Sequence, residues 1–165
     1  IVATAYGAKF SDLKSSGRAG IFSLFFGVIL SFSLGAIVAI AFGYDDPKDI
    51  TTIGAGTVTF VVGPVSGSAI GASSEVIALS VAAGLVKSIL VMTMTPLFAR
   101  RIGLDNPKSA MVFGGLMGTN SGVAAGLAAV DPKLVPYGAM TATFYTAVGC
   151  LFVPSVLFLF IDLMF

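Results

Sequence analysis

The residues Gly63-Pro64-Val65-Ser66-Gly67-Ser68-Ala69-Ile70-Gly71 decide the fold of this chain, because their pattern returns 55 residues later (63 to 118). The second copy reads Gly118-Thr119-Asn120-Ser121-Gly122-Val123-Ala124-Ala125-Gly126. Each copy interrupts an uncharged apolar run that is long enough to enter a lipid bilayer. Two such interruptions at corresponding places predict a binding site built from broken helices.

The composition places the chain in a membrane. Hydrophobic residues make up 56% of its 165 residues and charged residues only 10%, against the roughly 25% charged residues of a soluble domain. Runs with at most one charge, each near or above the ~20 residues that cross a hydrocarbon core, cover residues 19–42, 50–74, 76–99, 109–130 and 134–161. We therefore expect an all-α membrane protein, a transmembrane helix bundle in which two helices are interrupted.

Several function classes are excluded or disfavoured by what the sequence lacks. The net charge is +1 and the basic residues form no stripe, so nucleic acid is not an expected partner. The sequence contains no histidine, which rules out Ser-His or Cys-His catalysis and histidine-bound metal within this chain. Cys150 is the single cysteine, so no intrachain disulfide can form. No nucleophile and base pair can be assembled; we expect neither an enzyme nor an organic cofactor.

Polar turns divide the chain into four segments. Residues 1–18 are expected to end an upstream helix and to form a cytoplasmic connector, and residues 19–42 to form one transmembrane helix. Residues 43–101 and 102–165 are expected to form two repeats, each a broken helix or hairpin followed by a span.

Turn and proline signals predict where individual helices begin and break. Asp49 is the expected N-cap of the first repeat, with Thr51 and Thr52 competing, and the first helix is expected to break at Gly63-Pro64. In the second repeat, Asn106 with Pro107 predicts a helix start. Pro154 predicts a kink in the last span.

The distribution of charge favours an inverted arrangement of the two repeats. If residues 50–74 crossed the membrane fully, the basic loop with Arg100, Arg101 and Lys108 would lie opposite the basic loop before residue 19, against the positive-inside tendency. A re-entrant hairpin instead puts both basic loops in the cytoplasm and Asp45, Asp46 and Asp49 outside. A tilted full crossing stays open, because half-helices of ~9 residues span only ~14 Å.

The two interruptions offer binding groups for both signs of charge. A broken helix exposes amides at the start of its second half, which attract an anion, and carbonyls at the end of its first half, which attract a cation. Two such amide clusters facing each other would suit a substrate with two carboxylates. The expected substrate-binding residues are Ser66, Gly67, Ser68, Lys87, Thr119, Asn120, Ser121 and Gly122. The expected sodium-binding residues are Thr59, Gly63, Gly118 and Asn120.

Each of these signals also has a structural interpretation. The glycines of both copies form GxxxGxxxG ladders, which in membranes often serve only close helix packing. Lys87 is either a counter-ion inside the protein or a side chain that extends to the membrane surface. Glu75 and Asp131 either coordinate a cation or cap helices in water.

Longer motifs resemble a known family. They are Thr51-Thr52-Ile53-Gly54-Ala55-Gly56, Ile70-Gly71-Ala72-Ser73-Ser74-Glu75-Val76, Ala83-Gly84-Leu85-Val86-Lys87, Gly103-Leu104-Asp105-Asn106-Pro107, Met117-Gly118-Thr119-Asn120-Ser121-Gly122-Val123-Ala124-Ala125-Gly126-Leu127 and Leu134-Val135-Pro136-Tyr137-Gly138-Ala139. They closely resemble the M subunit (MadM) of the bacterial two-subunit malonate transporter. The resemblance implies a sodium-coupled malonate importer of the bacterial inner membrane that works with a smaller L subunit (MadL), and it covers roughly the last two-thirds of a family member.

Two other function classes stay open at this point. The interrupted segments resemble, more weakly, the LrgB-type family of exporter or holin-like membrane proteins. The chain could also be a non-transporting scaffold subunit whose partner holds the site. If it is a carrier, paired hairpins that move as a unit would give alternating access, in an elevator-like shift.

Overall fold

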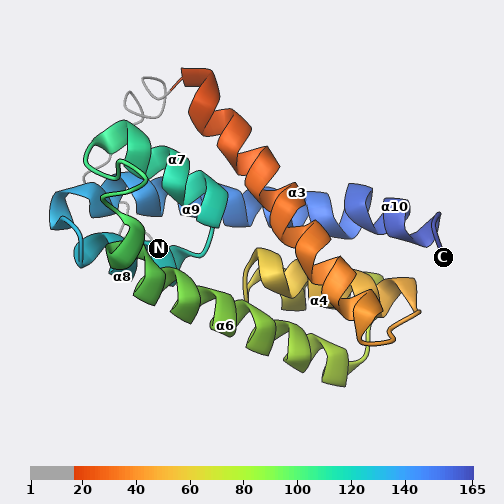
Figure 1. The fold of residues 1–165 in the computed structure, drawn as a ribbon. Coiled ribbons are helices and arrows are strands. Elements are labelled where there is room, and N and C mark those ends of the chain that lie inside the picture. Colours follow the sequence, from red (N-terminus) through yellow and green to blue (C-terminus); the bar gives the residue numbers. More distant parts are fainter. Residues whose placement is uncertain (1–16) are drawn as a thin grey trace. The chain divides into compact units, whose positions relative to one another are not determined.

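The computed structural model describes residues 17–165, which form helices and no strand within that range (Figure 1). The elements in chain order are α3 (Gly17–Ala41), α4 (Pro47–Val58), α5 (Val62–Ile70), α6 (Ser74–Phe98), α7 (Pro107–Met117), α8 (Asn120–Ala128), the short 3₁₀ helix η1 (Pro132–Leu134), α9 (Val135–Phe152), the π-helical turn η2 (Val153–Leu157) and α10 (Phe158–Asp162). Most of the predicted connector at residues 1–18 lies outside the described residues.

Three helical segments are long and apolar enough to cross a membrane. They are Ala19–Ala41, Ser74–Phe98 and the continuous stretch Pro132–Asp162. The two other apolar runs are each divided between two short helices, α4 with α5 and α7 with α8. The prediction of an all-α membrane protein with two interrupted helices is therefore confirmed.

The chain forms two compact units, and each unit contains one pair of short helices. The hairpin-1 unit comprises residues 28–87 and 146–165, and the hairpin-2 unit comprises residues 88–145 with the stretch that ends at Gly27. The boundaries between units fall inside α3, α6 and α9. Each long helix therefore contributes one part to each unit.

In the hairpin-1 unit, α4 and α5 pack as an antiparallel hairpin. A Cβ atom added at Gly63 would lie 3.1 Å from the Cα of Gly56, and one added at Gly67 would lie 2.8 Å from Thr52 Cγ2. Phe42, just after the end of α3, and Leu79, near the start of α6, line the same surface pocket. The hairpin therefore begins and ends on the same side of its unit.

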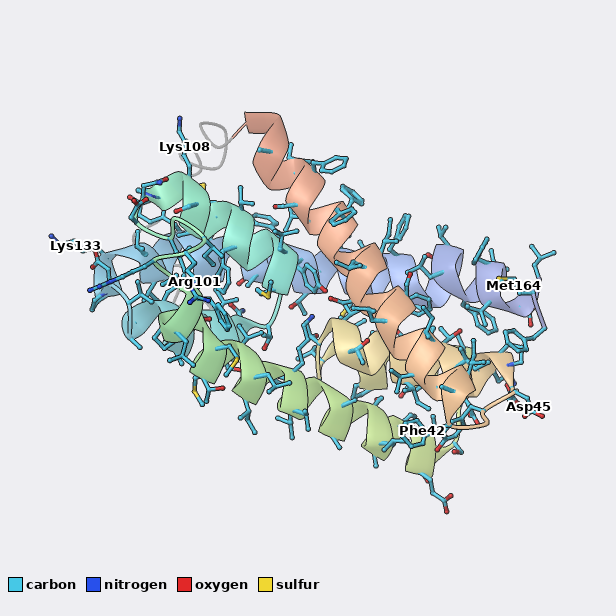
Figure 2. The ribbon with its side chains drawn as sticks, viewed as in Figure 1. Phe42, Asp45, Arg101, Lys108, Lys133 and Met164 are labelled. Atoms are coloured by element: carbon cyan, nitrogen blue, oxygen red, sulfur yellow. The ribbon has the colours of Figure 1, made fainter. Side chains whose placement is uncertain are left out.

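In the hairpin-2 unit, α8 returns toward the start of α7. Ala110 of α7 and Val123 and Leu127 of α8 share one buried core. The loop residues Asp105 and Asp131, which stand before α7 and after α8, line the same pocket. Figure 2 shows the basic side chains of Arg101, Lys108 and Lys133 around this end of the unit. The second interrupted run is therefore a hairpin as well.

The helix starts follow their capping residues, with one correction. The N-cap of α4 is Asp46, whose carboxylate accepts from the Lys48 amide at 2.7 Å, and not Asp49. Pro47 explains the shift, because proline is favoured at the first helical position. Burial and the nearby carboxylates of Asp46 and Asp45 raise the pKa of Asp49.

The predicted helix start at Asn106 is confirmed, and the predicted kink at Pro154 corresponds in the structure to a π-helical turn. Asn106 caps α7 in a capping box with Ser109, which satisfies two amide donors at once. Pro154 lies in η2, where the last long helix widens into a π-helical turn, because proline removes one backbone hydrogen bond of the α-helical ladder.

Candidate functional site

The two helix interruptions lie at residues 59–61, called break 1, and at residues 118–119, called break 2. The prediction that the first helix breaks at Gly63-Pro64 is wrong, because both residues lie in the first turn of α5. Proline is tolerated there, since the first-turn amides have no partner within their own helix. In the second copy, Gly118 and Thr119 form the break, and α8 begins at Asn120.

At break 1 the first amides of α5 all have partners. The Thr59 hydroxyl accepts from the amides of Val61 at 3.2 Å and Val62 at 3.1 Å. The Thr59 carbonyl accepts from the Gly63 amide at 3.2 Å, and Pro64 has no amide hydrogen. Break 1 therefore presents no unsatisfied donor at the start of α5.

At break 2 the first amides of α8 are open. The N-cap Thr119 makes no side-chain cap, and its hydroxyl is hydrogen-bonded to Ser88 Oγ. Within the described chain no acceptor is seen for the amides of Asn120, Ser121 and Gly122. The start of a helix with free amides attracts an anion.

The side chain of Asn120 has one donor engaged and its acceptor free. Asn120 Nδ2 donates to Thr143 Oγ1 at 3.0 Å, while the Thr143 hydroxyl donates to the Ala139 carbonyl at 2.8 Å. Because that hydroxyl gives its only proton to Ala139, it can only accept from Asn120, and this sets the orientation of the amide. Asn120 Oδ1 is buried and has no partner among the described residues. A buried oxygen of this kind suits a cation or a donor on a ligand.

At the C-terminal end of α4, a backbone carbonyl accepts a hydrogen bond from a lysine side chain of the protein. Lys87, in the middle of α6, donates to the Val58 carbonyl at 3.0 Å and to Ser31 Oγ at 2.9 Å. Val58 is the last residue of α4, where the helix dipole concentrates negative charge. Lys87 therefore holds its amino group inside the hairpin-1 unit and does not extend to the membrane surface.

Glycines of both ladders are used in packing, except Gly71, where an added Cβ atom would meet nothing within 4 Å. A Cβ atom at Gly63 would overlap the Ser80 side chain, and one at Gly122 would lie 2.7 Å from the Ser88 carbonyl. Gly67 is equally close to Ile77, at 2.7 Å. At Gly118, with a φ of +69°, a Cβ atom would overlap the ring of Tyr145. These contacts are those that the packing interpretation predicts.

The remaining predicted residues divide between buried and exposed positions. Ser66 is fully buried, and its hydroxyl has no partner within the described chain. Ser68 and Ser121 are exposed. Glu75 is exposed in the first turn of α6, and Asp131 caps η1 by accepting from the Lys133 amide at 2.9 Å, as the capping interpretation predicts for Asp131.

The structure adds residues that the motifs did not indicate. Ser88 and Thr143 contact break 2, Ser31 holds Lys87, and Tyr145 covers Gly118. They come from α3, α6 and α9, outside both nonapeptide copies. In the sequence, Thr143 and Tyr145 stand with Thr141 and Thr146 in a run of hydroxyl-bearing residues within the last span.

Three long apolar helices among the described residues define this chain as an all-α membrane protein, and two broken helices are typical of secondary transporters. The family model of the malonate/sodium symporter MadM subunit matches residues 1–165, the whole chain. The chain belongs to this family. Neither the curated proteins nor the solved structures include a significant match.

Proposed function

We propose that this chain is a carrier subunit that imports malonate together with sodium, and that break 2 is its principal binding site. The membership in the family of malonate/sodium symporter subunits supports the substrate and the coupling ion. The observation that carries the site is the open start of α8, where three amides lack partners beside the free oxygen of Asn120.

The chemistry of break 2 fits an anion that binds with a metal cation. The amides of Asn120, Ser121 and Gly122 are donors for one carboxylate of malonate. Asn120 Oδ1 and carbonyls at the end of α7, with Gly118 at the turn, are oxygen ligands for sodium. Bound sodium would offset the charge of the dianion, because no arginine lies in either break.

The first copy contributes a smaller set of groups to the proposed site. Among the buried side chains of α5, the hydroxyl of Ser66 has no partner in the described chain, and it is the candidate there for a polar contact with substrate. Gly67 and Ser68 join it as the neighbouring positions. Thr59 and Gly63 are less suited to hold sodium, since Thr59 already accepts two amides and Gly63 packs on Ser80.

Short helix lengths support re-entrant hairpins in an inverted repeat. Helices of 9 to 12 residues reach roughly 14–18 Å, about half of the ~30 Å hydrocarbon core. Each hairpin would therefore enter and leave on one side. Because α6 is long enough to cross the membrane between them, the two hairpins would enter from opposite sides, and their movement would give alternating access.

The proposed function also implies a partner subunit and a cellular location for this chain. We place the subunit in the bacterial inner membrane, crossing it several times, in a complex with a smaller MadL-like membrane subunit. Exposed apolar side chains along α3 and α6, including Phe22, Ile37, Val86 and Leu97, suit contact with lipid or with that subunit.

The test is uptake of labelled malonate by vesicles that contain the complete transporter. An inward sodium gradient should drive uptake, and an equal choline gradient should not. Asn120→Ala should weaken the apparent affinities for malonate and sodium by roughly tenfold or more. Asn120→Asp, which keeps an oxygen at the same place, should retain sodium dependence.

Two outcomes would overturn parts of the proposal. A wild-type transporter without sodium-driven uptake would favour an exporter or a scaffold role. Wild-type kinetics for Asn120→Ala toward both malonate and sodium would remove break 2 as the binding site.

A further inference from the structure

Lys87 lies too deep in α6 for its charge to reach water along the helix. It is about 20 Å from Ser74 and about 17 Å from Phe98 at 1.5 Å per residue. Its ammonium group instead bonds the Val58 carbonyl and Ser31 Oγ within the hairpin-1 unit. An intramembrane charge held in this way is costly and therefore marks a functional position.

The position of the ammonium group is the one that a metal cation takes at a broken helix. Carbonyls at the end of the first half-helix carry partial negative charge and are ligands for a coupling cation. At break 1, the carbonyl of Val58, the last residue of α4, receives Lys87 at 3.0 Å. Ser31 Oγ, a hydroxyl oxygen, also accepts from the ammonium group at 2.9 Å.

The amides at the start of α5 are also satisfied by the protein. Thr59 accepts the first two amides on the α5 side, and Pro64 has none to offer. We propose that Lys87 is the resident cation of break 1, a tethered substitute for a sodium ion, so that only break 2 is left for the cation that moves with substrate. This inference rests on the proposed sodium coupling, and it deepens that proposal by assigning the two breaks different ions.

In this arrangement Lys87 is a positioning residue. It fixes the end of α4 against α3 and α6 through Val58 and Ser31. Its amino group is tethered to the protein through every transport cycle, whereas the cation at break 2 arrives with substrate and leaves with it. The sodium dependence of transport should therefore report break 2 alone.

Three substitutions at Lys87 separate this role from simple packing. Lys87→Ser removes the cation and leaves space and a hydroxyl for an ion. Lys87→Met fills a similar volume without charge. Lys87→Arg keeps the charge and serves as the conservative rescue.

The three variants are compared with the wild type by two measurements on the complete transporter. The first is the melting temperature during a sodium titration without malonate, with choline keeping the ionic strength constant. The second is the sodium dependence of malonate uptake. The first measurement needs no transport, so it decides the role of Lys87 even if the proposed function fails.

The expected results differ for each variant. Lys87→Ser should gain a sodium-dependent rise in melting temperature beyond that of the wild type. Its uptake should fall roughly tenfold or more at low sodium and recover at high sodium with a steeper dependence. Lys87→Met should stay impaired at every sodium concentration, and Lys87→Arg should keep the wild-type steepness.

The inference is overturned if Lys87→Ser and Lys87→Met respond identically to sodium. It is also overturned if both retain wild-type uptake and stability. If wild-type vesicles show no sodium-driven uptake while Lys87→Ser still gains sodium-dependent stabilisation, the proposed function fails and the assignment of Lys87 stands.

Discussion

Break 1 and break 2 have similar architecture and different chemistry. Both interrupt an apolar run with a hairpin of short helices whose first half packs closely on the long helix that follows: a Cβ atom at Gly56 would overlap the Ser80 carbonyl, and one at Gly114 would overlap the Gly138 carbonyl. Break 1 is closed by the Thr59 hydroxyl and the Lys87 ammonium. Break 2 keeps free amides and a free buried oxygen.

The difference shows how two similar copies of a motif can have different roles. The same packing holds both hairpins, so the backbone arrangement does not by itself make a binding site. What distinguishes break 2 is the set of donors and acceptors that the protein leaves unused. Substitutions in the two copies can therefore separate packing from binding.

The largest expected effect is that of Gly118→Ala. The new methyl group would overlap the ring of Tyr145, and the backbone at φ +69° is unfavourable for any L-residue with a side chain. We expect a loss of roughly 3–5 kcal/mol of stability, measured as a much lower melting temperature or no folded transporter. Gly71→Ala is the control: its φ is +75°, but nothing lies within 4 Å, so about 1 kcal/mol is expected.

The second test compares the packing of the two hairpins. Gly56→Ala and Gly114→Ala each place a methyl group on a backbone carbonyl of the next long helix. Each should destabilise the transporter by roughly 2–3 kcal/mol, with closely similar shifts in melting temperature. A large effect in one hairpin and none in the other would show that the packing is not equivalent.

Much of the fold could be predicted from the sequence, because it depends on local signals. Hydropathy identified the five apolar runs, and Asn106-Pro107 marked a helix start. The position of break 1 could not be read from Pro64, since proline is compatible with both a break and a first helical turn. Thr59, a capping residue type just before that turn, was the available signal.

The chemical difference between the two breaks could not be predicted from the sequence. The two copies look alike because glycines of both lie in close contacts with neighbouring segments. The groups that distinguish them are Lys87 and Ser88, which come from α6 and bond residues 29 and 31 positions away in the chain. Their choice of partner depends on tertiary structure, which no local pattern records.

A smaller effect is expected from removing the cap of break 1. Thr59→Val loses the hydroxyl that accepts from Val61 and Val62 and should cost about 1 kcal/mol. The loss should appear as a lower melting temperature of the purified transporter. An unchanged melting temperature would mean that this hydroxyl does not stabilise the start of α5.

The smallest effect is expected for Tyr145→Phe. The ring that covers Gly118 remains, and only the hydrogen bond from the phenol to the Gly27 carbonyl at 3.1 Å is lost. About 1 kcal/mol of destabilisation or less should result, again read from the melting temperature. A loss as large as that of Gly118→Ala would show that the hydroxyl, and not the ring, is the important contact.

The most direct test is an experimental structure of the complete transporter with malonate and sodium bound. We expect malonate density at the amides that begin α8 and cation density beside Asn120 Oδ1, with the Lys87 ammonium still on the Val58 carbonyl. Cation density at the Val58 carbonyl with Lys87 turned away, or malonate bound at α5 alone, would contradict the division of roles between the two breaks.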